Sequence, residues 1–234
     1  MTSMGVISAY HGTTEVVAKS MISSQECIFS FSKAPTDKDY YNLWLGDGFY
    51  LFEYDFYAFK WMAGKLKNYD EPRAIEIFKD EYCILKVSME PHEDRVFDLN
   101  NLKHRTAFDR ILTGLMNLNP PNRGLKKEYF TDGLVINILF NELDYSDNYD
   151  IVVSMFPINK GNYDKFNQLR SGPLLQKQYC VKNKNIIREI SQFDFYESID
   201  DYMNIWETLF PKTKPFGKEE ESIYTVDRGL SYES

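Results

Sequence analysis

The segment with the clearest potential for chemistry is a pair of glycines followed by a tyrosine: Gly46, Gly48 and Tyr50. Glycines one residue apart allow the backbone to take a tight path close to a ligand. An isolated Gly-x-Gly is more often an ordinary turn. It is also not a dinucleotide fingerprint of the Rossmann type, because Leu51 stands where the third glycine would be. The neighbouring segments therefore decide how this one is interpreted.

Two further segments accompany the glycine pair. His11, Gly12 and Thr13 end a short apolar run, and Trp61 follows Tyr50 by eleven residues in a stretch with helical spacing. An isolated histidine near a strand end is commonly structural. Aromatic faces, however, stack on flat and cationic ligands. The combination therefore indicates a site for a flat ligand.

This ordered set resembles the poly(ADP-ribose) polymerase and diphtheria-toxin branch of the ADP-ribosyltransferases, and small bacterial and phage-related toxins of that superfamily. In that branch, a His-Gly-Ser/Thr strand is followed by Gly-x-Gly-x-Tyr and by a helix with a second aromatic residue, a tyrosine. A later strand reads Glu-Tyr-hydrophobic-Val, and residues 178–181 read Gln-Tyr-Cys-Val here. The resemblance covers roughly residues 6–190.

The resemblance implies that NAD is bound as a substrate. His11 would bond a ribose hydroxyl, and the backbone of Gly12 would hold the nicotinamide carboxamide. Thr13 would assist nearby, and Gly48 would belong to the NAD-binding segment.

The same resemblance implies that Tyr50 and Trp61 sandwich the nicotinamide ring. Nicotinamide would then leave as the ribose acquires oxocarbenium character, a charge that a carboxylate at the position of Gln178 normally stabilises. A glutamine can accept a hydrogen bond but brings no charge, so polymer formation is not expected. Gln176 would lie where relatives contact the acceptor, and its amide could pair with a nucleobase edge.

Three other carboxylates could replace the missing one, although we expect each to be solvated surface: Glu53, Glu128 and Asp132. The leading hypothesis is a mono-ADP-ribosyltransferase of toxin or anti-phage defence type, acting on a protein, RNA or DNA acceptor. A toxin would also imply a neutralising antitoxin protein. One alternative is a catalytically degenerate NAD-binding module that acts through a partner. Another is a structural domain without an NAD site.

The net charge, the cysteines and the lack of long apolar runs argue against several classes of protein and of site. The net charge of −8 excludes a global basic field for nucleic acid. Two basic clusters are expected to be solvated surface: Lys182, Lys184 and Arg188, and Arg123, Lys126 and Lys127.

Cys27, Cys83 and Cys180 are odd in number and widely spaced, which predicts free thiols and no zinc site. No apolar run long enough for a membrane span and no secretory signal are found, so we expect a cytoplasmic protein without membrane contact.

Periodicity and turn residues predict the secondary structure. Strands are expected at residues 6–11, 49–52, 81–89, 95–99, 151–156, 178–182 and 186–190. Helices are expected at residues 14–23, 55–66, 105–116, 131–143 and 199–209. This order predicts an α+β fold. The resemblance implies an ADP-ribosyltransferase-like split β-sandwich over residues 1–190, with an NAD cleft and flanking helices. Residues 191–234 would form a C-terminal helix and tail packed on it or extending from it.

Overall fold

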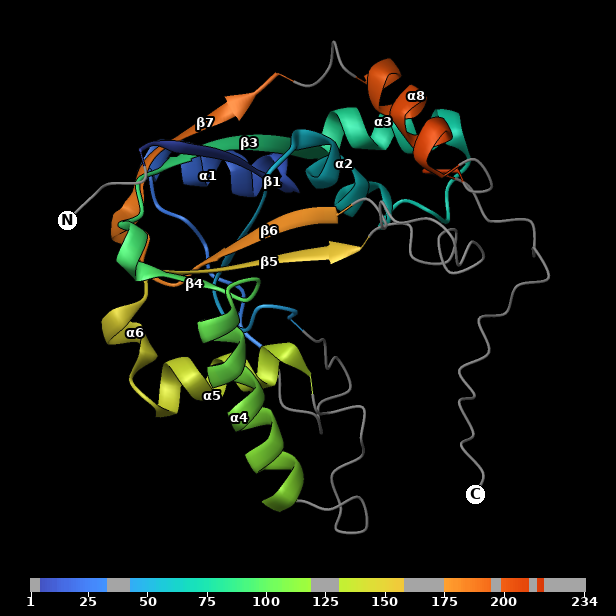
Figure 1. Ribbon diagram of the computed structural model, residues 1–234. Helices are drawn as coiled ribbons and strands as arrows, with labels where there is room; N and C mark the ends of the chain where they lie inside the picture. The colour runs from blue at the N-terminus through green and yellow to red at the C-terminus, as the bar shows by residue number, and fades with distance from the viewer. Residues whose placement is uncertain are drawn as a thin grey trace, which may run out of the picture.

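A computed structural model describes residues 5–32, 43–118, 131–157, 175–194, 199–210 and 214–216. It has the predicted mixed α+β character (Figure 1). The strands are β1 (Ile7–Thr14), β2 (Phe49–Phe52), β3 (Tyr82–Met89), β4 (Val96–Asp98), β5 (Ile151–Pro157), β6 (Leu175–Val181) and β7 (Ile187–Phe193). The helices are α1 (Glu15–Ser24), α2 (Asp55–Ala63), α3 (Glu71–Glu81), α4 (Leu102–Leu118), α5 (Asp132–Glu142), α6 (Tyr145–Asn148) and α8 (Ile199–Leu209). Short 3-10 turns lie at Glu93–Arg95 and Lys184–Ile186.

The seven strands form one sheet in the order β4-β5-β6-β2-β1-β3-β7, antiparallel except for the β4–β5 pair. Its two blocks meet at a narrow junction. β1 pairs with β3 along its whole length, from Ile7 opposite Met89 to Thr14 opposite Tyr82. Between β1 and β2, the register holds a single pair, Tyr10 opposite Phe52. In Figure 1, β7, β3 and β1 accordingly fan away from β6, β5 and β4.

Helices pack against the sheet, and the buried side chains between them form three apolar clusters. α1 packs on the β1–β3–β7 block, where Ala18 and Met21 are buried. α4 and α5 pack on the other block, beside β4 and β5, with Phe108 and Leu139 in the core. The third cluster joins α2, α3 and α8.

The C-terminal helix α8 packs onto α2. Ile199, Tyr202 and Trp206 share a buried cluster with Phe56 and other residues of α2. β7, the strand before α8, runs to Phe193. Burial of this apolar face explains why α8 is held against the sheet domain rather than extending from it.

Asp55 joins α2 to the C-terminal helix. Tyr54 is the N-cap of α2, and Asp55 lies in the first turn. The Asp55 carboxylate accepts a hydrogen bond from the Tyr202 hydroxyl of α8. Its acidic charge is still favourable at a helix N-terminus, and it also fixes the two helices to each other.

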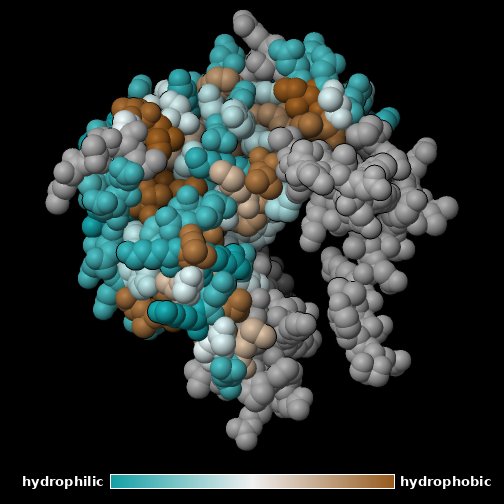
Figure 2. All heavy atoms as spheres, viewed as in Figure 1, coloured by the Kyte–Doolittle hydropathy of each residue, from teal (hydrophilic) through white to brown (hydrophobic). Residues whose placement is uncertain are grey.

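The outer surface gives no sign of a membrane-spanning element. Within the described ranges, no helix combines the length and the apolar character that crossing a bilayer requires. On the face shown in Figure 2, apolar side chains gather in separate patches among hydrophilic ones.

Candidate ligand-binding cleft

A pocket of about 590 Å³, open solvent at its mouth included, lies where β1 and β2 diverge. Its lining comprises His11, Gly12, Ser30, Leu43, Trp44, Tyr50, Phe52, Trp61 and Gln178. The structure thus brings together five predicted site residues from β1, β2, α2 and β6. Thr13 and Gly48 were also predicted and are not among the residues that line it. Gln176 lines a neighbouring groove instead.

His11 bridges the diverging strands. Its Nδ1 lies 2.8 Å from the carbonyl oxygen of Tyr50. A carbonyl can only accept, so Nδ1 carries the proton and Nε2 of the neutral ring is left as an acceptor. Burial lowers the pKa of His11 to about 4, against the opposing effect of the bond to Tyr50 and with a smaller lowering from Lys65. The ring is therefore neutral at pH 7, and Nε2 can accept a hydrogen bond from a ligand hydroxyl.

Residues 43–50 form one side of the pocket, which we call the anchored wall. The Tyr50 hydroxyl donates to the Gly46 carbonyl at 2.7 Å and accepts from the Leu45 amide at 2.8 Å. On the outer side, Asn137 of α5 accepts from the Asp47 amide at 2.7 Å and donates to the Asp47 carboxylate at 2.9 Å. Because its hydroxyl is occupied, Tyr50 offers a ligand only its ring. Burial is also the main cause that raises the pKa of Tyr50.

Lys182, directly after β6, supports the anchored wall, and its predicted place on the solvated surface is wrong. Its partly buried ammonium group donates to the carbonyl oxygens of Leu45, at 2.8 Å, and of Asp47. Burial is the main cause that lowers its pKa. The strand period places Lys182 on the same face as Gln178 and Cys180. That alternation is the signal by which the sequence could have identified it.

The predicted glycines are explained by close packing. A Cβ on Gly12 would lie 2.8 Å from Cγ and Sδ of Met62, so β1 approaches α2 closely at this point. Gly48 has φ +153°, and a Cβ there would lie 2.6 Å from Sγ of Cys180 and from the carbonyl oxygen of Val181. Gly48 therefore allows β2 to meet β6 and faces that strand, whereas Gly12 both packs and lines the pocket.

Other residues of the lining differ from the anchored wall in their polar groups. We call Trp61 and Gln178, together with Gln176 of the neighbouring groove, the open wall. The exposed fractions of Gln176 and Gln178 are only 7% and 5%. In the described part of the chain, neither side-chain amide has a hydrogen-bond partner, although both line a hollow. Trp61 is 58% exposed, so a large aromatic face stands free beside them.

None of the proposed substitute carboxylates lines the pocket. The Glu53 carboxylate lies 3.8 Å from the Lys177 amine. Asp132 lies in the first turn of α5, and burial is the main cause that raises its pKa. Glu128 lies outside the described residues. The polar side chains that the described structure places around the pocket are thus neutral, including Gln178.

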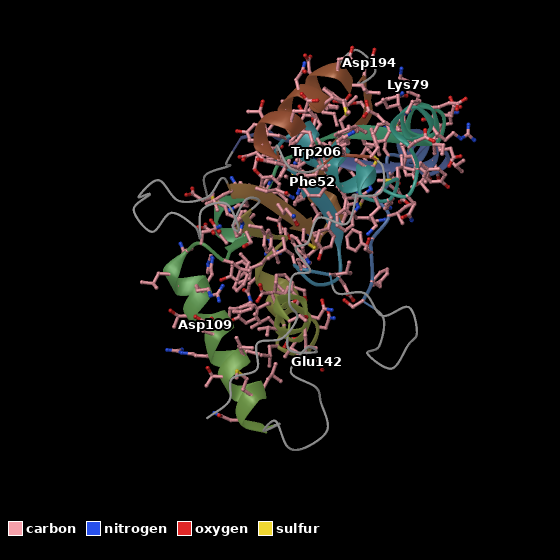
Figure 3. All side chains as sticks on the ribbon, turned by 90° about the vertical axis from the view of Figure 1, so that its right-hand side faces the viewer. Phe52, Lys79, Asp109, Glu142, Asp194 and Trp206 are labelled. Carbon is pink, nitrogen blue, oxygen red and sulfur yellow. The ribbon has the colours of Figure 1, made fainter. Side chains whose placement is uncertain are left out.

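A second hollow, of about 1080 Å³ including open solvent, adjoins the pocket. It is lined by Trp44, Phe52, Tyr57, Lys60, Trp61, Gly64, Lys65, Gln176, Gln178 and Trp206. We call it the side groove. Phe52 and Trp206, labelled in Figure 3, lie on the same side of the molecule, where α8 approaches the sheet. Trp61 and Gln178 line both hollows and therefore mark the passage between them.

The cysteines are free thiols, with Cys83 and Cys180 buried and Cys27 partly so. Across the described ranges, no group of three or more His, Cys, Asp and Glu side chains is placed to hold a metal ion.

Comparison with known proteins gives one relative and no family model or solved structure that matches. The chain is 30% identical over 216 residues to an uncharacterized protein of Methanocaldococcus jannaschii. The match covers 87% of this chain and 94% of the archaeal protein. Similarity over nearly the full length of both chains shows that this protein belongs to the same family as the archaeal one.

Proposed function

We propose that the cleft binds NAD and that the protein is a mono-ADP-ribosyltransferase, of the toxin or anti-phage defence type. The observation that carries this proposal is the convergence of His11, Gly12, Tyr50, Trp61 and Gln178 on one pocket. These are the positions to which the resemblance with ADP-ribosyltransferases assigns NAD contacts. The narrow junction between the two blocks of the sheet supports a split β-sandwich of that kind.

In this proposal, nicotinamide stacks between the Tyr50 ring and Trp61. The backbone of Gly12 holds its carboxamide, and Nε2 of His11 accepts from a ribose hydroxyl. The glycosidic C1′–N bond breaks, its electron pair leaves with nicotinamide, and the ribose gains oxocarbenium character. The acceptor nucleophile then bonds to C1′ and loses its proton. Gln178 accepts from the ribose 2′-hydroxyl without a charge, which predicts slower turnover than a carboxylate would give.

The decisive experiment combines NAD binding with product analysis. Calorimetry measures NAD affinity, and labelled NAD measures both nicotinamide release and transfer to a lysate. Digestion of the products by protease and, separately, by nuclease identifies the acceptor. Trp61→Ala is expected to weaken NAD binding about tenfold or more, because a stacked ring contributes about 1–3 kcal/mol.

Tyr69→Ala is the matched control, because it removes an exposed aromatic ring that is not among the residues lining the two hollows. Its NAD affinity is expected to equal that of the wild type. Absence of NAD binding by the wild-type protein would contradict the proposal.

A second candidate function is an NAD-binding module without turnover that acts through a partner. It is favoured by the neutral Gln178 at the position where the resemblance leads one to expect a glutamate. Under this alternative, the wild type binds NAD and releases no nicotinamide, whereas Gln178→Glu gains release. Release by the wild type itself would exclude the alternative. In the toxin interpretation, a neutralising antitoxin is the proposed partner.

A further inference from the structure

We propose that the side groove binds the acceptor, and that the acceptor is a nucleotide of a single-stranded nucleic acid. The inference rests on the proposed function, because the pocket between Tyr50 and Trp61 must hold NAD for the groove to hold the acceptor. The passage at Trp61 and Gln178 then places the acceptor beside the ribose.

The first observation concerns the buried amides. Gln176 and Gln178 alternate along β6 and point to the same face of the sheet. Ser154 of β5 lies directly opposite Gln178 and is also buried, with 8% of its surface exposed. No hydrogen bond of these three side chains is found within the described ranges. Gln176 and Gln178 line the groove, whereas Ser154 does not. The Gln176 amide can both donate and accept, as the edge of a nucleobase requires.

The second observation concerns the aromatic side chains. Trp61 is largely exposed, while Tyr57 and Trp206 are almost buried within the lining of the groove. Nucleobases of any sequence stack on such rings. The groove therefore combines aromatic rings with the amide of Gln176, which can read a base edge, while Gln178 is left to the ribose of NAD.

The third observation concerns charge. Lys60 and Lys65 line the groove, and Asp and Glu are absent from its described lining. Elsewhere, Lys19, Lys177 and Lys184 each lie within 4.0 Å of a glutamate carboxylate.

Neither Lys60 nor Lys65 forms such an ion pair with a described residue. The Lys60 ammonium lies 5.0 Å over the ring of Phe210. Two unpaired cations beside a stacking platform are suited to backbone phosphates, although the chain carries a net charge of −8.

Transfer of ADP-ribose from NAD to the base needs no other reagent than water as the proton acceptor. A ring or exocyclic nitrogen of the base forms a bond to C1′ of the NAD ribose. The C1′–nicotinamide bond breaks and its electron pair leaves with nicotinamide. The proton on the attacking nitrogen passes to water, so no oxidant or reductant is required.

The test measures binding of fluorescently labelled eight-nucleotide single strands of mixed sequence, one DNA and one RNA, by anisotropy at low salt. The variant Lys60→Gln/Lys65→Gln is compared with Lys86→Gln/Lys103→Gln. The control removes the same charge at exposed lysines outside the groove. We expect about tenfold weaker binding for the groove variant and less than about a twofold change for the control. Gln176→Leu is expected to change the preference among bases, which a purely electrostatic site would not show.

Equal weakening by both double variants, or absence of binding to either strand by a protein that binds NAD, would overturn the proposal. NAD affinity is measured separately and is expected to stay within about twofold in Lys60→Gln/Lys65→Gln. A loss of NAD binding in that variant would assign the groove to the adenosine diphosphate half of NAD instead and would also overturn the acceptor proposal. A wild-type protein that binds no NAD counts against the proposed function, whatever the oligonucleotide result.

Discussion

The two sides of the cleft use their polar groups in opposite ways. In the anchored wall, the Tyr50 hydroxyl both donates and accepts, and Asp47 is bonded to Asn137. In the open wall, the buried amides of Gln176 and Gln178 have no described partner. A satisfied group holds the structure together, whereas a side-chain amide that lines a hollow without a described partner is available to a ligand. The difference predicts that changes in the anchored wall affect stability, and that changes in the open wall affect binding.

The largest effect on stability is expected at the contact between α5 and the anchored wall. A Cβ on Gly133 would lie 1.7 Å from the carbonyl oxygen of Leu43, so Gly133→Ala must displace the wall. We expect a loss of about 3 kcal/mol in the free energy of unfolding, measured by urea denaturation. Gly114→Ala in α4 is the control, because nothing lies within 4 Å of its added Cβ. That variant should gain about 0.5–1 kcal/mol, and a similar loss in both would contradict the prediction.

The next effect is the pH dependence that His11 confers. Its pKa is about 4 in the folded protein, against 6.5 as its ordinary value, so the unfolded chain binds more protons between these values. Its contribution is complete above about pH 6.5 and is lost as the pH falls through about 4. Because the ring is only partly buried, we expect about 2 kcal/mol.

The measurement is the free energy of unfolding from pH 7 to pH 4, compared with that of His11→Asn. Asparagine can still donate to the Tyr50 carbonyl but does not titrate. The wild-type protein should therefore lose more stability than the variant over this range. Parallel pH profiles would show that His11 is not buried in its neutral form.

A smaller loss is expected when the anchored wall loses one hydroxyl. Tyr50→Phe keeps the ring and leaves the Gly46 carbonyl and the Leu45 amide without their partner. We expect a loss of about 1.5 kcal/mol in the free energy of unfolding. Tyr54→Phe is the control, because this exposed tyrosine has no hydroxyl hydrogen bond within the described structure. An unchanged stability for Tyr50→Phe would show that the hydroxyl does not hold the wall.

The smallest effect on stability is expected in the open wall. Gln178→Leu removes a buried amide that has no described partner, so the free energy of unfolding should change by less than about 0.5 kcal/mol or increase. Under the proposed function, NAD affinity, measured by calorimetry, should nevertheless fall about tenfold, because the ribose would lose its proposed acceptor. A large loss of stability together with unchanged NAD affinity would reverse the comparison between the two walls.

Local sequence patterns predicted most of the helices and strands. The main differences are the greater length of β1 and the helix α3, which was not predicted. The bounds of β2 and α8 agree with the prediction, because each is a compact apolar or amphipathic run. β1 is longer than predicted and runs to Thr14, since Gly12 pairs with Ile84 in β3 although glycine weakens a strand pattern. Helix α3 was not predicted, although Asp70 caps it, Pro72 stands in its first turn, and Ala74 and Phe78 share its buried face.

The predicted site is similarly divided. The resemblance to ADP-ribosyltransferases singled out His11, Gly12, Tyr50, Trp61 and Gln178, and these residues line one pocket. Lys182 was assigned to the solvated surface, because a lysine within a basic cluster is usually there. Its bonds to the carbonyls of Leu45 and Asp47 span more than a hundred residues of chain. The alternation with Gln178 and Cys180 indicates the face on which Lys182 lies, but not these partners.

The sequence by itself determined which side chains are available for a flat ligand, and that the charge expected at residue 178 is absent. Only the tertiary structure decided which polar groups are already satisfied. The pocket lies where β1 separates from β2 after the Tyr10–Phe52 pair. There Nδ1 of His11 bonds to the Tyr50 carbonyl, and the amide of Gln178 has no partner among the described residues. The physical reason is that hydrogen bonds in a sheet join residues distant in sequence, whereas periodicity reports only on neighbours along the chain.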